Sequence, residues 1–318
     1  MKILVIQLGR IGDMILATPM FSAIKTKFPL CELHVLTSRH NHSILKDNPN
    51  VDSIRVYEKS PDKFIKSIYK INRQHYDYLI DPKDHFSMES NIIAFWSGAK
   101  FKIGLNQNNH NNYNVSISHQ EESKGLHYTQ RCLKSLAYFG IVVPQIPPRP
   151  ELFLNTETEK NINEILIGKS HYILINISAS SPNKMWQNEK WKEFINKISY
   201  TNEKLYIINP ASHENEIDEI LKKCTNVISI KSGNIMAAFS IISRAKLLIT
   251  PDTSLVHVAA AFNIPVLSLY SGMENFYEKF YPLSDIYKVV KAPDVENGIK
   301  NISVEELFSA YGKIIEQL

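Results

Sequence analysis

The feature that most constrains the fold is an alternation of short apolar runs with helix-patterned runs along the whole chain. Runs such as KILVIQL near the start and YILINIS in the second half are almost continuously apolar, as expected for strands covered by helices on both faces. Between the strands, apolar residues recur at helical spacing, as at Leu16, Met20, Ala23 and Ile24. This βαβ series predicts an α/β fold with doubly wound parallel sheets and right-handed crossovers.

The series runs twice, and 318 residues are enough for two domains of ordinary size. A proline-rich stretch, IVVPQIPPRPELFLN (Ile141 to Asn155), has no helical period and is interpreted as the interdomain connection. We therefore expect one domain over residues 1–155, a second over residues 156–300 and a C-terminal helix within residues 301–318. The asparagine-rich segment Asn106–Asn114 is interpreted as a flexible loop that could order over a substrate.

Composition narrows the class of protein. Hydrophobic residues make up 44% and charged residues 21%, which is ordinary for a globular chain. No apolar run has the length of a transmembrane helix, and the N-terminus resembles a first strand rather than a signal peptide, so a cytoplasmic location is expected. Cys31, Cys132 and Cys224 form no CxxC pair and the histidines show no HExxH spacing, so reduced thiols, no metal site and no cofactor are expected.

The positive charge is concentrated in the first half. Residues 1–155 carry 19 Lys and Arg against 13 Asp and Glu, a net charge of +6, while the remainder carries 17 against 19, a net charge of −2. This excess favours an anionic partner or a peripheral contact with the inner face of the cytoplasmic membrane, although a solvated basic surface explains it as well. There is no nucleic-acid motif, so a nucleic-acid partner is not expected.

The first motif is LGRIGDM, which follows the first strand. Gly9 and Gly12 allow a tight strand-to-helix turn and the close approach of a ligand. Their spacing is not the G-x-G-x-x-G of dinucleotide binders, which argues against an NAD site. Asp13 stands at the helix start, where an acid either caps the helix or is presented as a general base, and the motif alone leaves both open.

The second motif is ITPDTSLVHVAAAF, in which a strand ends and a helix begins. Asp252, Thr253 and Ser254 open the helix, and His257 lies one turn further on. Free N–H groups and hydroxyls at a helix start can bind a diphosphate. The alternative is an ordinary N-cap with His257 satisfied inside the core.

Two further candidates lie between these motifs. The serine-rich loop after the YILINIS strand contains Ser178 and then Lys184, which could neutralise a phosphate or could be a solvated surface lysine. After the next strand, Glu214 could accept hydrogen bonds from ribose hydroxyls. Glu216 competes for that role, and acids in the first turn of a helix also occur without any ligand.

Taken together, these motifs resemble glycosyltransferase family 9, the heptosyltransferases of lipopolysaccharide inner-core synthesis. The strongest matches are LGRIGDMILATP near the start and DTSLVHVAAAFNIPVLSLYSG near the end, and NKMWQNEKW supports them. The resemblance implies a GT-B fold, in which two Rossmann-like domains face a central cleft. It also implies that the first domain binds the acceptor, that the second binds the nucleotide-sugar, and that the C-terminal helix packs back on the first domain.

The resemblance further implies an inverting, metal-independent transfer of a heptose from ADP-heptose to a lipopolysaccharide-core or related surface-glycan acceptor, an anionic glycolipid or glycan. Asp13 would deprotonate the acceptor hydroxyl and Lys184 would stabilise the leaving diphosphate. The remaining residues assigned to the nucleotide-sugar are Gly9, Gly12, Ser178, Glu214, Asp252, Thr253, Ser254 and His257.

The chain departs from the family pattern at a few positions. Ser254 stands where family members often have glycine, and NISAS replaces a Pro-Gly pair early in the phosphate loop. These differences bear on the identity of the donor more than on the fold. The alternatives are a transferase that uses another nucleotide-sugar, a sugar-nucleotide epimerase of similar fold, and a family member that binds nucleotide or glycan without catalysis.

Overall fold

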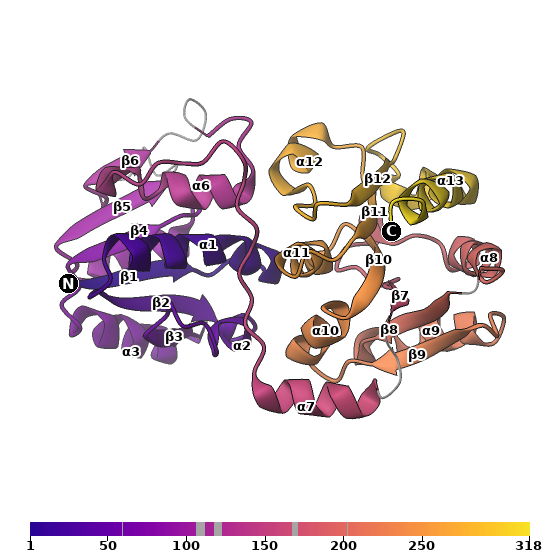
Figure 1. Cartoon of the computed structure of the whole chain (residues 1–318). Coiled ribbons are helices and arrows are strands. Elements are labelled where there is room, and N and C mark those ends of the chain that lie inside the picture. The colour runs from indigo at the N-terminus through magenta and orange to yellow at the C-terminus, as the bar shows by residue number, and fades with distance from the viewer. Residues whose placement is uncertain (59, 106–111, 118–122, 167–170, 202) are drawn as a thin grey trace. The chain divides into compact units, whose positions relative to one another are not determined.

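The computed structural model describes residues 1–58, 60–105, 112–117, 123–166, 171–201 and 203–318 (Figure 1). The chain forms two compact units. Unit 1 consists of Met1–Phe153 together with Glu278–Phe280, and unit 2 consists of Leu154–Tyr277 together with Tyr281–Leu318. The main division thus falls after Phe153, at the end of the proline-rich stretch. In the described ranges, no helix combines the length and the hydrophobicity that crossing a bilayer requires.

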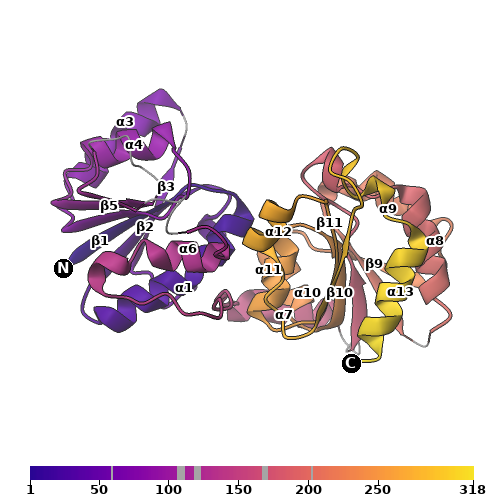
Figure 2. The same cartoon turned by 90° about the horizontal axis from the view of Figure 1, so that it is seen from above.

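Unit 1 is built on a parallel sheet. Its described residues form six strands in the order β3-β2-β1-β4-β5-β6. The strands are β1 (Lys2–Gln7), β2 (Glu32–Ser38), β3 (Ser53–Tyr57), β4 (Tyr78–Asp81), β5 (Phe101–Leu105) and β6 (Val115–Ile117). Its helices are α1 (Ile11–Lys27), α2 (His42–Leu45), α3 (Pro61–Asn72), α4 (Met88–Trp96), α6 (Tyr128–Lys134) and the 3-10 helix η1 (Ala137–Phe139). Figure 2 shows α3 and α4 on one face of this sheet and α1 and α6 on the other.

Unit 2 repeats the plan. Its described strands follow the order β12-β11-β10-β7-β8-β9 and all pair in parallel. They are β7 (Tyr172–Ile175), β8 (Lys204–Asn209), β9 (Val227–Lys231), β10 (Ala245–Pro251), β11 (Val266–Tyr270) and β12 (Tyr287–Lys291). The helices are α7 (Thr156–Ile165), α8 (Asn188–Ile198), α9 (Glu214–Leu221), α10 (Ile235–Ile242), α11 (Ser254–Ala261) and α13 (Val304–Ile315), with 3-10 turns η2 (Pro182–Lys184), η3 (Ala211–His213) and η4 (Gly298–Asn301). Helix α12 (Glu274–Phe280) begins in unit 2, and its last residues, Glu278–Phe280, belong to unit 1.

The sheets confirm the predicted doubly wound α/β class. The central strands β1 and β7 are buried along almost their whole length, which is why their sequences are continuously apolar. Other details differ from the prediction. Residues Tyr128–Phe139 have a helical pattern in the sequence, but the α-helix ends at Lys134, and η1 follows it before Gly140 adopts a left-handed φ of 69°.

The loop expected over Asn106–Asn114 lies mostly outside the described residues, since the description stops at 105 and resumes at 112. The end of that segment is held by hydrogen bonds. Asn112 donates to the side-chain oxygen of Asn91 at 2.6 Å, and Asn114 accepts from the backbone N–H of Lys102 at 2.8 Å.

Helix α1 continues through Pro19, where the sequence predicts a kink. Proline has no N–H to donate to the carbonyl of Ile15, and the hydroxyl of Thr18 donates to that carbonyl instead, at 2.7 Å. The same hydroxyl oxygen accepts from the backbone N–H of Glu151 at 2.8 Å. Thr18 therefore replaces the helical hydrogen bond that Pro19 cannot make, and it also joins the proline-rich stretch to α1.

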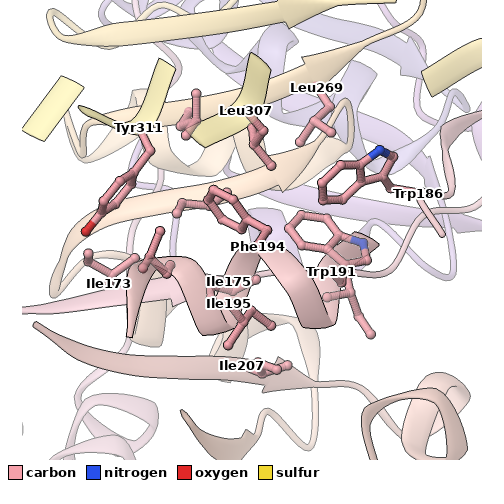
Figure 3. Packing of buried hydrophobic residues seen from close by; sticks show 14 of the residues in the cluster. Ile173, Ile175, Trp186, Trp191, Phe194, Ile195, Ile207, Leu269, Leu307 and Tyr311 are labelled. Carbon is pink, nitrogen blue, oxygen red and sulfur yellow. The ribbon is translucent and has the colours of Figure 1, made fainter. Parts of the chain in front are cut away.

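The C-terminal helix α13 belongs to unit 2. Its apolar face completes the core of that unit. Leu307 and Tyr311 lie against Trp186 and Phe194 of the same cluster (Figure 3). Burial of these large side chains, each worth roughly 1.5–3 kcal/mol, fixes the helix to α8.

Candidate functional site

Most predicted site residues follow the strands at the centre of each sheet. The strand order reverses between β1 and β4 in unit 1 and between β7 and β10 in unit 2, and ligands of doubly wound sheets bind at such points. Asp13 follows β1, Ser178 and Lys184 follow β7, and Asp252 follows β10. Each unit therefore carries its own group of candidate residues at the carboxyl edge of its sheet.

Asp13 is the third residue of α1. Its Oδ2 accepts a hydrogen bond from the backbone N–H of Arg10, the N-cap residue, at 3.0 Å. Within the described part of the chain, its Oδ1 has no hydrogen-bond partner, and the residue is half-buried. The carboxylate is thus held by one oxygen, as a helix cap requires, while the other remains available to a ligand.

The surroundings raise the pKa of Asp13. Partial burial raises it above the ordinary aspartate value, while the hydrogen bond from Arg10 and the charge of Lys279 act in the opposite direction. A carboxylate with a raised pKa accepts a proton more readily than an exposed aspartate. This property suits a general base better than a helix cap, for which a low pKa would be more favourable.

Gly9 lies in the turn between β1 and α1, and Gly12 is the second residue of α1. Neither adopts a left-handed φ, so the turn does not depend on glycine for its backbone angles. At Gly9 the reason is space: a Cβ there would lie 2.6 Å from Oδ2 of Asp13. Gly9 therefore lets the Asp13 carboxylate approach the turn, and Asn41 fixes the turn by donating to the carbonyl of Gly9 at 2.8 Å.

A second charged group lies on the same edge of unit 1 and was missed in the sequence. Asp84, three residues after β4, is 4% exposed and contacts two cations: Arg131 at 3.0 Å and Lys279 at 2.5 Å. Burial raises the pKa of Asp84, but His85, Lys279 and Arg131 outweigh it and hold that pKa well below its usual range. Lys279 also lowers the pKa of Asp13, which couples the two acids.

Asp81, the last residue of β4, is fully buried. Its Oδ2 accepts from the hydroxyl of Tyr113 at 2.9 Å and its Oδ1 accepts from the backbone N–H of Lys83 at 3.2 Å. Burial raises the pKa of Asp81 to about 6. Its lack of exposure indicates a structural role, joining β4 to the residues before β6.

In unit 2, Lys184 and Asp252 form an ion pair. Nζ of Lys184, at the end of η2, lies 2.5 Å from Oδ2 of Asp252 and 4.5 Å from the ring centroid of Phe276. Asp252 is 3% exposed, and burial raises its pKa while the charge of Lys184 lowers it. Lys184 is therefore not a solvated surface lysine, which was the alternative interpretation of the sequence.

The start of α11 has the expected form. Thr253 is the N-cap residue, and its hydroxyl accepts from the N–H of Leu255 at 3.4 Å. Ser254 is the first helical residue and is half-buried, while His257 is buried at 4% exposure. The N–H groups of this first turn, beside a lysine, can stabilise negative charge on a ligand.

The loop between β7 and Lys184 is held by side-chain hydrogen bonds. Asn176 donates to the hydroxyl of Thr250 at 2.9 Å, which ties the end of β7 to β10. The hydroxyl of Ser178 donates to the side-chain oxygen of Asn176 at 2.7 Å, so the hydrogen of Ser178 is directed back into the loop. Ser178 thus contributes to the shape of the loop, and its oxygen remains able to accept.

The position of Lys184 is fixed by residues near the C-terminus. Gly298, with a left-handed φ of 58°, packs against Asn183 so closely that a Cβ would lie 2.1 Å from the Asn183 carbonyl oxygen. The indole N–H of Trp186 donates to the carbonyl of Ile302 at 3.0 Å. These contacts join distant segments, and no local sequence pattern predicts them.

Glu214 lies apart from this group, at the start of α9 after β8. Its Oε1 pairs with Nζ of Lys231 at 2.7 Å, and both side chains are exposed. Its competitor Glu216 lies 3.6 Å from Nδ1 of His213. Neither acid joins the Lys184–Asp252 pair. Among the described residues, no group of three His, Cys, Asp or Glu side chains could hold a metal ion.

The sequence matches both a family model and individual known proteins. The sequence model of glycosyltransferase family 9 (heptosyltransferase) matches residues 64–304. Lipopolysaccharide heptosyltransferase 3 of Escherichia coli (strain K12) is 23% identical over 288 residues, covering 84% of this chain and 81% of that protein.

Solved structures share the fold. A glycosyl transferase family 9 protein from Veillonella parvula superposes with a TM-score of 0.84 at 16% identity, over 100% of this chain and 97% of the other. The E. coli ADP-heptose LPS heptosyltransferase II superposes with a TM-score of 0.81 at 18% identity, over 100% and 99% of the two chains. The two parallel-sheet units therefore make up a GT-B fold.

Proposed function

The chain belongs to glycosyltransferase family 9, the heptosyltransferase family, and from that premise we propose that it transfers a heptose from ADP-heptose to a lipopolysaccharide-core or related glycan acceptor. The transfer is proposed to be inverting and independent of metal. Unit 1 binds the acceptor in this proposal, and unit 2 binds the nucleotide-sugar.

The proposal depends most on the hydrogen bonding and the raised pKa of the Asp13 carboxylate. One carboxylate oxygen is fixed by the N–H of Arg10, the other has no partner among the described residues, and partial burial raises the pKa. In the proposed reaction, Asp13 removes the proton of an acceptor hydroxyl. The acceptor oxygen then bonds to the anomeric carbon as the bond from that carbon to the diphosphate oxygen breaks, in one displacement with inversion.

On the donor side, negative charge accumulates on the departing diphosphate. We assign Lys184 and the first-turn N–H groups of α11 to that charge, since a fixed cation and oriented dipoles can stabilise a leaving group without a metal. We assign Thr253, Ser254 and His257, at the start of α11, and Ser178, in the loop after β7, to the same donor site. Glu214 is assigned to the ribose hydroxyls through Oε2, the oxygen that Lys231 does not occupy.

Two observations favour the proposed donor and acceptor classes. The E. coli structure that shares the fold is described as an ADP-heptose LPS heptosyltransferase, which favours ADP-heptose as donor. The net charge of +6 over residues 1–155 favours an anionic acceptor, such as a phosphorylated glycolipid at the inner face of the cytoplasmic membrane.

The decisive variant is Asp13→Asn, which retains the size of the side chain and an oxygen for the Arg10 N–H but removes the base. We expect kcat to fall by about 10²–10⁴-fold, with ADP binding unchanged. Turnover is measured by mass detection of the glycosylated acceptor, and ADP affinity by calorimetry. Near-normal turnover of Asp13→Asn would remove the catalytic role. Thermal shifts with ADP, UDP and GDP test the nucleotide separately, because a base variant does not affect that comparison.

A further inference from the structure

The exposed face of α4 is composed entirely of large apolar side chains. Its four exposed residues are Met88, Ile92, Phe95 and Trp96, and Trp96 is 57% exposed. Their spacing of i, i+4, i+7 and i+8 places them on one side of the helix, opposite the residues that face the sheet. A helix on the surface of a globular protein normally presents polar residues on its solvent-facing side. The apolar face of α4 therefore indicates an interaction site.

Helix α3 extends the apolar face and adds positive charge. It lies beside α4 on the same face of the sheet (Figure 2), and Asn72 donates to the carbonyl of Trp96 at 3.0 Å. Its exposed apolar residues are Ile65 and Tyr69, 67% and 61% exposed. We call these six side chains, Ile65, Tyr69, Met88, Ile92, Phe95 and Trp96, the α3–α4 face.

The border of this face is basic. Lys66 and Lys70 each follow one of the apolar residues of α3, and neither forms an ion pair with another described residue. Arg73 lies 5.6 Å from the ring centroid of Tyr69 and donates to its hydroxyl at 3.0 Å. Lys63 pairs with Glu58. The acids on the two helices are Asp62 and Glu89, so with Lys66, Lys70 and Arg73 the border keeps a net positive charge.

The combination of exposed apolar side chains and neighbouring lysines indicates what binds to the α3–α4 face. Aromatic and aliphatic side chains bordered by lysines are suited to the boundary between headgroups and acyl chains of an anionic bilayer. A second copy of the chain is a poorer match, because a two-fold contact through this face would bring like-charged lysine borders together. We propose that the α3–α4 face inserts into the surface of an anionic phospholipid membrane, with Lys66 and Lys70 on the lipid phosphates.

The test uses vesicles without any glycan, so its result does not depend on the proposed transferase reaction. Wild-type protein is mixed with vesicles of phosphatidylethanolamine and phosphatidylglycerol, or of phosphatidylcholine alone, and bound protein is measured by flotation. We expect binding to the anionic vesicles that weakens with added salt. Trp186 and Trp191 are buried in unit 2, so a blue shift of tryptophan emission on binding reports the exposed Trp96.

Two double variants locate the contact. Ile92→Ser/Phe95→Ser should lower binding at least about tenfold, since both side chains are exposed and their loss should not affect folding. Lys66→Glu/Lys70→Glu should abolish the preference for phosphatidylglycerol. Tyr200→Ser, which removes a 92% exposed aromatic side chain from unit 2, is the matched control and should bind as wild type.

Three outcomes overturn the proposal. These are no binding of wild type to anionic vesicles, wild-type binding by both double variants, or an unshifted emission of Trp96 in the bound protein. Sedimentation velocity without lipid adds a fourth: a concentration-dependent dimer that Ile92→Ser/Phe95→Ser converts to monomer would assign the face to a second copy.

Discussion

The ammonium group of Lys184 lies 2.5 Å from Oδ2 of Asp252, although 68 residues separate the two in sequence. Each comes from a turn at the carboxyl end of a central strand of the same sheet. Asp252 is buried while Lys184 is partly exposed, so the lysine both neutralises a buried carboxylate and remains within reach of a ligand. A diphosphate that binds here would share Lys184 with Asp252.

The Lys184–Asp252 pair predicts that a second substitution can restore the stability lost on removing Lys184 without restoring activity. Lys184→Met leaves a buried carboxylate without its cation, and we expect the free energy of unfolding of unit 2 to fall by about 1–3 kcal/mol. Lys184→Met/Asp252→Asn should recover most of that loss, because an amide carries no charge. Both variants should remain slow, since each lacks the lysine assigned to the leaving group. Stability is read from hydrogen exchange of β10, and equal stability of the single and double variants would contradict the coupling.

Gly9→Ala tests the position of Asp13 without changing the carboxylate. The new Cβ would lie 2.6 Å from Oδ2 of Asp13 and must displace it from the N–H of Arg10. We expect kcat/KM for the acceptor to fall about 10-fold or more while ADP affinity is unchanged. Gly312→Ala, on the open side of α13, is the control and should retain full activity. If Gly9→Ala transferred sugar at the normal rate, the placement of Asp13 by this turn would be irrelevant to catalysis.

We expect the hydroxyl group of Thr18 to contribute to the stability of unit 1. Thr18→Val keeps the shape of the side chain but leaves the carbonyl of Ile15 and the N–H of Glu151 without their partner. We expect the stability of unit 1 to decrease by about 1–3 kcal/mol. Thr18→Ser, which keeps the hydroxyl, should lose less. The comparison is made by hydrogen exchange of α1, and equal losses in the two variants would assign the effect to packing.

Asp81 predicts a pH dependence of stability. Burial raises its pKa to about 6 in the folded chain from an ordinary value of 3.8, so the folded state binds the proton more tightly than the unfolded state. The free energy of unfolding should therefore decrease as pH rises from about 4 to 6, by about 2–4 kcal/mol from this group, and stay low above it. The loss is complete at neutral pH.

Asp81→Asn removes this titration and imitates the protonated carboxyl. Measured by hydrogen exchange of β4, the stability of the variant relative to wild type should increase between pH 5 and pH 8. Acids with lowered pKa values, such as Asp84, titrate in the opposite direction but are common to both proteins and cancel in the difference. A difference that does not change with pH would show that Asp81 is not protonated in this range.

The sequence alone determined the class of the fold and the places where chemistry is expected. Continuous apolar runs such as those of β1, β7 and β10 predict buried parallel strands, because such strands have no solvent-facing side. Short or half-exposed strands, such as β6 and β12, lack that signal and were missed. The turns at Asp13 and Asp252 were found because each is a local strand-to-helix junction.

Only the tertiary structure decided which of these residues act together. The pairing of Lys184 with Asp252, the contact of Gly298 with Asn183 and the Asp84–Lys279–Arg131 group all join segments that are distant along the chain. It also placed α13 on the core of unit 2 and left the outward face of α4 apolar. A periodic pattern shows that a helix has an apolar face, but which surface covers that face depends on how the strands are ordered in the sheet.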